Sequence, residues 1–189
     1  MAGNGLRWIP AEYDLGFFVI FARDLSPVEL LSRLGVATDS AVPLSREAVE
    51  REEIQTGDPY IRAGCSEGWS FGLRSWGPHG DLRSIAEQVS MGTEAVILLN
   101  AGDATSEFIY GKEGEVVCKF DGHLPGYRSG SEPDLLLLAM MRLGMLAEPE
   151  PEISGVDAVL ALAEAYFSLN LPCDLVESGE LIAGRIQAL

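Results

Sequence analysis

The sequence predicts an α+β protein built on an antiparallel sheet of about six strands, with helices packed on one face and a helical C-terminal third. Apolar residues make up 47% of the 189 residues and the mean hydropathy is +0.14, so the chain can form a hydrophobic core. Runs of strand-like segments precede runs of helix-like segments. Only two strands are followed by a helix of crossover length, which disfavours a doubly wound parallel sheet.

The first 35 residues contain the clearest local signals. The apolar run LGFFVIFA at residues 15–22 predicts a buried strand. Ser26 and Glu29 form a capping-box pattern around Pro27, which favours the first turn of a helix. Gly35 is then the residue at which this helix ends.

The middle of the chain alternates between predicted helices and strands. In order, we expect a helix capped by Ser45 that extends to about residue 55, strands at 59–65 and 69–75 joined by a tight turn, and a helix capped by Asp81 that ends at Gly92. The two strands resemble a hairpin. Residues 15–35 and residues 69–92 each contain a predicted strand, a turn and a helix. These two similar units favour an internal duplication.

The remaining segments predict a meander followed by helices. In order, these are strands at 94–100, 107–111 and 115–121, a helix from Ser131 to Gly144, an acidic Pro-Glu spacer at 148–152, a helix at about 156–169, and short helical turns. We therefore divide the chain into an α+β core domain at 1–147 and an acidic helical segment at 148–189, packed on the same domain.

Charge narrows the classes of partner. The chain has 29 acidic and 13 basic residues, a formal net charge of -16, and residues 131–189 contain ten acidic but only two basic side chains. Such a surface repels phosphate, so we expect no direct nucleic acid binding and no membrane adhesion. A basic protein partner is favoured. The alternative is that the acidity serves only solubility.

The N-terminus and the longest apolar stretch predict a cytoplasmic protein. Glu12 and Asp14 precede the first apolar run, where a signal peptide needs positive charge. The stretch 135–146 is interrupted by Arg142 and is shorter than the roughly 20 residues needed to span a bilayer. Its part 135–141 is apolar nearly all the way round, so we expect burial within its own domain or, alternatively, a homodimer contact.

Cysteine and histidine chemistry is sparse. Cys65, Cys118 and Cys173 are far apart and form no C-x-x-C pair, so we expect neither a disulfide framework, a metal site nor a cofactor. Cys118 and His123 lie within six positions, the arrangement of a Cys-His nucleophile. Strand alternation instead places Cys118 in the core, and no catalytic residue is predicted.

A set of residues in a fixed order carries a family resemblance over most of positions 8–170. They are Ser26-Pro27, Glu29-Leu30-Leu31, Arg33-Leu34-Gly35, Gly68-Trp69, Ser90, Gly92-Thr93, Ala95-Val96, Phe108, Tyr110, Gly114, Val117, Phe120-Asp121, Gly130-Ser131, Pro133-Asp134 and Leu143-Gly144. In this order they resemble an uncharacterised actinobacterial family, a domain of unknown function. The resemblance implies no established activity. Members often carry a glutamate shortly after the Gly-Trp pair, where this chain has Arg74.

The densest cluster of side chains suited to recognition lies in one short stretch. It comprises Trp69, Arg74, Trp76, His79 and Asp81. The glycine-rich turn before the predicted helix could hold an anion on backbone amides, or its glycines could serve only the turn conformation. We expect any pocket to lie near Trp69, Trp76 and His79, between the sheet and a helix.

Together these observations support two hypotheses. The leading one is a non-enzymatic protein-protein interaction domain of the immunity, inhibitor or regulatory-adaptor type, which presents its acidic surface to a basic partner. A nucleic-acid mimic is a special case. The alternative is a small-molecule-binding protein or a specialised-pathway enzyme that uses the aromatic pocket.

Overall fold

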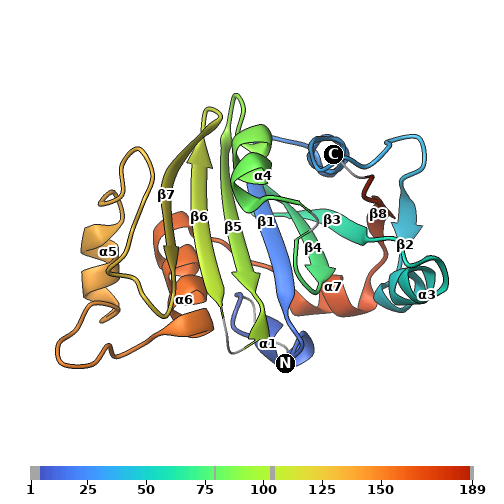
Figure 1. The fold of residues 1–189 in the computed structure, drawn as a ribbon. Coiled ribbons are helices and arrows are strands. Elements are labelled where there is room, and N and C mark those ends of the chain that lie inside the picture. Colours follow the sequence, from blue (N-terminus) through green and yellow to red (C-terminus); the bar gives the residue numbers. More distant parts are fainter. Residues whose placement is uncertain (1–4, 79, 103–104, 188–189) are drawn as a thin grey trace.

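An antiparallel sheet of eight strands forms the centre of the computed structural model, which describes residues 5–78, 80–102 and 105–187. The strands are β1 (Phe17–Arg23), β2 (Val42–Leu44), β3 (Tyr60–Ser66), β4 (Trp69–Ser75), β5 (Glu94–Asn100), β6 (Ser106–Lys112), β7 (Glu115–Asp121) and β8 (Leu181–Arg185). Their order across the sheet is β2-β8-β3-β4-β1-β5-β6-β7 (Figure 1). The α+β class and the antiparallel pairing are confirmed, whereas the expected number of about six strands was too low.

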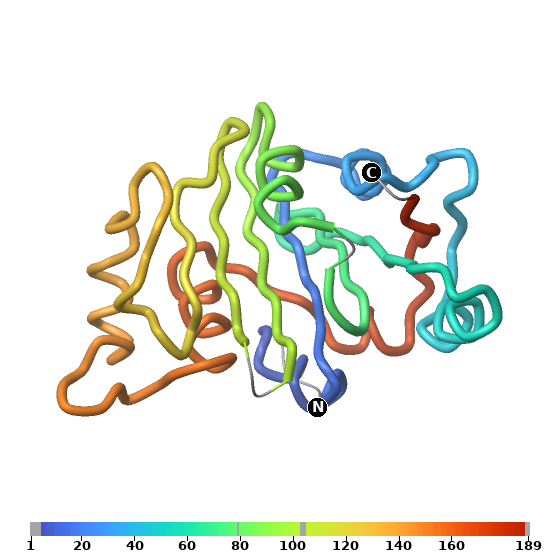
Figure 2. Tube along the Cα trace, viewed as in Figure 1, coloured from blue at the N-terminus to red at the C-terminus, as the bar shows by residue number. Residues whose placement is uncertain are grey.

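Two strands, β2 and β8, were not predicted. β2 has only three residues and contains Pro43, which an edge strand tolerates because one side of its backbone needs no partner. β8 inserts between β2 and β3, so the red end of the chain lies beside β2 in Figure 2. The prediction of a helical C-terminal third was therefore correct only in part, because its last segment forms strand β8 of the sheet.

Helices cover both faces of the sheet. They are α1 (Ile9–Glu12), α2 (Pro27–Arg33), α3 (Arg46–Thr56), α4 (Leu82–Val89), α5 (Leu137–Arg142), α6 (Gly155–Phe167) and α7 (Cys173–Ser178). In Figure 1, α4 lies in front of the sheet and α6 lies behind it. The expectation of helices on one face was wrong.

The central strand explains why both faces need cover. Phe17, Val19 and Phe21 of β1 pack into one buried cluster, together with α6. Phe18 and Ile20 pack into a second cluster, which includes residues of α2 and α4. Since every side chain from Phe17 to Ala22 is buried, the strand has no solvent face.

Local capping signals fix the helices near the sheet as predicted. In α2, the Ser26 hydroxyl accepts a hydrogen bond from the Glu29 amide at 3.2 Å, and the Glu29 carboxylate accepts one from the Ser26 amide at 2.8 Å. In α3, the Ser45 hydroxyl accepts from the Ala48 amide at 3.2 Å. The helix α3 ends at Gly57, whose φ of 72° suits glycine.

The helix predicted from Ser131 begins only at Leu137. The preceding residues instead follow the edge of β7, where the amides of Ser131 and Glu132 donate to carbonyls of that strand at 3.0 and 2.9 Å. These hydrogen bonds satisfy an exposed sheet edge and so compete with the helix. Met140 of α5 and Leu136 just before the helix are buried, while Leu138 is 70% exposed. The homodimer contact through residues 135–141 stays a prediction.

Candidate ligand-binding pocket

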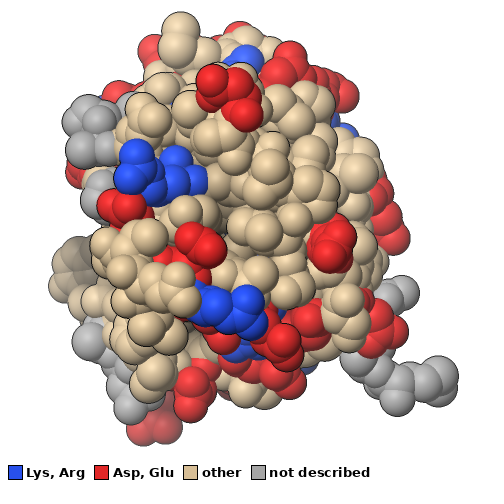
Figure 3. All heavy atoms as spheres, turned by 90° about the vertical axis from the view of Figure 1, so that its right-hand side faces the viewer, with Lys and Arg blue, Asp and Glu red and all other residues tan. Residues whose placement is uncertain are grey.

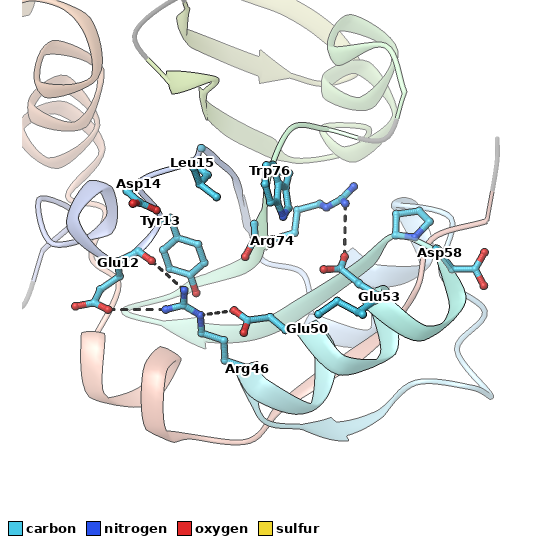
Figure 4. A pocket seen from close by; sticks show the side chains of 15 residues that line it. Glu12, Tyr13, Asp14, Leu15, Arg46, Glu50, Glu53, Asp58, Arg74 and Trp76 are labelled. Atoms are coloured by element: carbon cyan, nitrogen blue, oxygen red, sulfur yellow. Dashed lines mark hydrogen bonds and ion pairs between the residues drawn. The ribbon is translucent and has the colours of Figure 1, made fainter.

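A cavity of about 590 Å³ opens between α3, the segment joining α1 to β1, and the end of β4. Its volume lies within the range of roughly 300–1,000 Å³ that is typical of small-molecule sites. We call it the Trp76 pocket. Figure 4 shows its three walls: Tyr13, Asp14 and neighbours from the α1–β1 segment, the acidic face of α3, and Arg74 with Trp76.

Arg46 fixes the α1–β1 wall to α3. Its guanidinium donates to the Glu50 carboxylate at 2.8 Å and to the Glu12 carbonyl at 2.9 Å, and it also contacts Glu177 of α7. The same guanidinium lies over the Tyr13 ring, 4.3 Å from its centroid. Because its donors are engaged within the protein, Arg46 serves to hold the pocket together.

The floor beneath Tyr13 is a buried polar network. The Tyr13 hydroxyl donates to the Glu177 carboxylate at 3.1 Å and accepts from Arg62 at 3.2 Å. Arg62 is buried and also donates to the Val176 carbonyl at 2.8 Å. Burial raises the pKa of Tyr13, so its hydroxyl keeps its proton at neutral pH. The network ties α1, β3 and α7 together under the pocket.

Arg74 differs from Arg46 because its guanidinium has few hydrogen-bonding and ion-pair partners. Its side chain is only 11% exposed, and its nearest ion pair, with the Glu53 carboxylate, is 3.6 Å long. Its Nε–H has no hydrogen-bond partner among the described residues. Burial lowers the pKa of Arg74 and raises the pKa of Glu53. A buried donor without a partner is costly in a protein, so the Arg74 guanidinium keeps unmet hydrogen-bonding capacity.

Apolar side chains surround the mouth of the pocket. Trp76 is 54% exposed, and its backbone has a φ of 71°, a left-handed conformation that is unusual for a bulky residue. Its amide donates to the Gly16 carbonyl at 3.0 Å, which holds the residue against the start of β1. Leu15 and Ile54 are also exposed. The pocket thus offers apolar surface beside charged groups.

The structure separates the five residues predicted as a site. Arg74 and Trp76 line the Trp76 pocket. Trp69, at the other end of β4, is only 3% exposed, and its ring lies edge-on to Phe167 with a centroid distance of 6.4 Å. It adjoins a smaller hollow of about 250 Å³.

The remaining two predicted residues follow Trp76. The Asp81 carboxylate caps α4 by accepting from the amide and hydroxyl of Ser84 at 2.8 and 2.9 Å, and these hydrogen bonds lower its pKa. His79 lies outside the residues that the structure describes. The expected grouping of Trp69, Trp76 and His79 therefore reduces, for the described residues, to Trp76 with Arg74.

Sequence reasoning missed the walls contributed by α3 and by Tyr13. One signal was present: Arg46, Glu50 and Glu53 are spaced to share a helix face. Nothing in the sequence indicated that this face meets the end of β4.

Cys118 is buried, as predicted. Its thiol lies 3.4 Å from the Pro133 carbonyl, and burial raises its pKa to about 11, which disfavours the reactive thiolate. His123 is exposed. In the described ranges, no group of three or more His, Cys, Asp or Glu side chains is arranged to hold a metal ion. Across the same residues, every helix is too short or too polar to cross a membrane.

Comparisons with known proteins place the chain in a family without assigning a function. Neither the curated proteins nor the solved structures gave a match. A family model, described as a family of unknown function (DUF6461), matches residues 6–188. This match confirms the resemblance to a domain of unknown function, while an actinobacterial source stays a prediction. The chain belongs to the family of unknown function DUF6461.

Proposed function

We propose that this protein binds a small organic molecule with a carboxylate group in the Trp76 pocket, and that it acts by binding rather than by catalysis. The observation that carries the proposal is Arg74, a guanidinium withdrawn from solvent into a pocket wall with one long ion pair. A guanidinium presents its donors in a planar fork that matches a carboxylate. A ligand carboxylate would supply the hydrogen bonds that Arg74 lacks.

Trp76 supports the proposal because it gives the ligand an apolar surface beside this charge. The indole is half exposed in a wall of the pocket, and its backbone occupies a strained conformation. Residues in such conformations persist where the surrounding structure holds them, and they cluster at ligand sites. Aromatic rings contribute large contact areas with little loss of conformational entropy. The ligand would therefore place an aromatic or aliphatic part against Trp76.

A second candidate function is recognition of a basic protein partner, as an immunity-type, inhibitory or adaptor domain. Five carboxylates line or rim the pocket. Over β2, β8 and α3, acidic groups surround a broad uncharged area with only small groups of basic atoms (Figure 3). Such complementarity gives salt-sensitive association. A basic partner that is retained at about 50 mM salt and lost at about 500 mM would support this candidate.

Calorimetry with a set of small carboxylic acids, amino acids and dipeptides tests the first proposal. Binders should lose about tenfold or more in affinity in Arg74→Gln, because a hydrogen bond to a charged group contributes about 1.5–3 kcal/mol. Arg51→Gln is the matched control, since Arg51 is an exposed residue of α3 outside the lining. A set without binders, or binding that survives Arg74→Gln, would rule out the proposal.

A further inference from the structure

We infer that the ligand of the Trp76 pocket is a zwitterion, with a carboxylate at Arg74, an ammonium group at the Asp14 end, and an apolar body between them. The inference rests on the proposed function, since it assumes that Arg74 binds the carboxylate. It adds the second charge and the overall size of the ligand.

The balance of charge in the lining favours a ligand that carries a cationic group. Two guanidiniums, those of Arg46 and Arg74, face five carboxylates, which belong to Glu12, Asp14, Glu50, Glu53 and Asp58. A ligand with only a negative charge would enter a region of net negative charge, which disfavours its binding. A ligand that also carries a positive charge offsets it.

The ion pairs indicate which carboxylates can receive the ammonium group. Glu50 pairs with Arg46 at 2.8 Å, and Asp58 pairs with Arg185 at 2.8 Å. Glu53 is the partner of Arg74. Within the described part of the chain, Asp14 makes no ion pair, and the carboxylate of Glu12 lies 3.9 Å from Arg46.

The arrangement of the walls sets the order of groups along the ligand. Figure 4 shows Glu12 and Asp14 on the α1 side and Arg74 with Glu53 on the other side, with Trp76 between them. The exposed indole can contact both an apolar body and a nearby cation. A cavity of about 590 Å³ accommodates a molecule of dipeptide size.

Dipeptides with free termini, each with an N-acetylated and a C-amidated counterpart, are the probes. Calorimetry should detect binding of at least one free dipeptide. The N-acetylated form should lose about tenfold or more in affinity because it lacks the cation. The C-amidated form should show a similar loss because it lacks the carboxylate.

Variants of the lining residues test where the ammonium group and the carboxylate of the ligand bind. The double variant Glu12→Gln with Asp14→Asn should weaken binding of the free dipeptide, whereas it should not weaken binding of the N-acetylated form, because the loss of two carboxylates lowers the repulsion of an anion. Arg74→Gln should weaken both. Asp39→Asn is the matched control, because Asp39 is exposed and outside the pocket. Melting temperatures of all variants verify folding.

The outcomes separate this inference from the proposed function. If N-acetylated forms or simple carboxylic acids bind as tightly as free dipeptides and depend on Arg74, the inference is overturned and the proposed function stands. If free dipeptides bind without any dependence on Glu12 and Asp14, the inference is also overturned. Failure of every carboxylate probe, or indifference to Arg74→Gln, overturns both.

Discussion

The two ends of strand β4 carry tryptophans with opposite roles. Trp69 begins the strand and lies in the core beside Phe167, whereas Trp76 follows its last residue and is 54% exposed in the wall of a pocket. Seven positions of chain separate a structural aromatic from a candidate recognition aromatic. Residue type alone therefore does not identify a site. What distinguishes Trp76 is its exposure beside Arg74, a buried group with unmet hydrogen-bonding capacity.

The largest expected effect is on the stability of the two tryptophan variants. Trp69→Ala should lower the free energy of unfolding by about 3–5 kcal/mol, because it leaves a cavity among core side chains. Trp76→Gly should change it by about 1 kcal/mol or less, since glycine adopts the left-handed conformation without strain. Urea unfolding measures both values. Equal losses of unfolding free energy would mean that the two tryptophans have the same structural role.

An intermediate effect is expected at the pocket floor. Tyr13→Phe should cost about 1–3 kcal/mol, because it removes the hydroxyl that Arg62 and Glu177 both use. Tyr127→Phe is the control, since Tyr127 is 82% exposed. Urea unfolding again provides the values. A Tyr13→Phe variant as stable as the control would mean that the network does not hold α1, β3 and α7 together.

The smallest expected effect concerns Asp81 and its dependence on pH. Hydrogen bonds from Ser84 lower the pKa of Asp81 in the folded state, so its stabilisation is present above the unfolded pKa of about 3.9 and is lost as pH falls through the folded pKa. Asp81→Asn keeps a capping oxygen but does not titrate. Its melting temperature should match the wild type at pH near 7 and fall less steeply in acid.

Calorimetry with Asp81→Asn shows whether this residue has only a capping role. Ligand affinity should be unchanged in the variant, because its carboxylate caps α4 and does not line the Trp76 pocket. Loss of affinity would instead extend the recognition site beyond Trp76 into the start of α4.

The fold was predictable where the signal is local. The capping box of Ser26 and Glu29 and the hairpin of β3 and β4 depend on neighbours in sequence. The continuous apolar run at 15–22 also indicated a strand covered on both faces, but the prediction did not use it. β2 and β8 were not predictable in this way, because their short segments become strands only through pairing with each other and with β3.

Only one wall of the candidate site could be predicted from the sequence. Arg74 and Trp76 lie close in sequence and stood out as a cluster. The alternation of Trp69, Phe71 and Leu73 could have assigned Trp69 to the core, because these three residues share one strand face. Tyr13 and the face of α3 reach the pocket through tertiary packing, which no short pattern encodes.

The most direct test of the account is a heteronuclear NMR titration of the three indole N–H signals, from Trp8, Trp69 and Trp76, with the tightest-binding carboxylate probe. Substitution of each tryptophan by phenylalanine assigns the signals. We expect that the Trp76 signal shifts with ligand, that the Trp69 signal does not, and that the Trp76 shift requires about tenfold or more ligand in Arg74→Gln. A shift of the Trp69 signal alone, or a Trp76 shift with the same midpoint in Arg74→Gln as in the wild type, would contradict the proposed role of the Trp76 pocket.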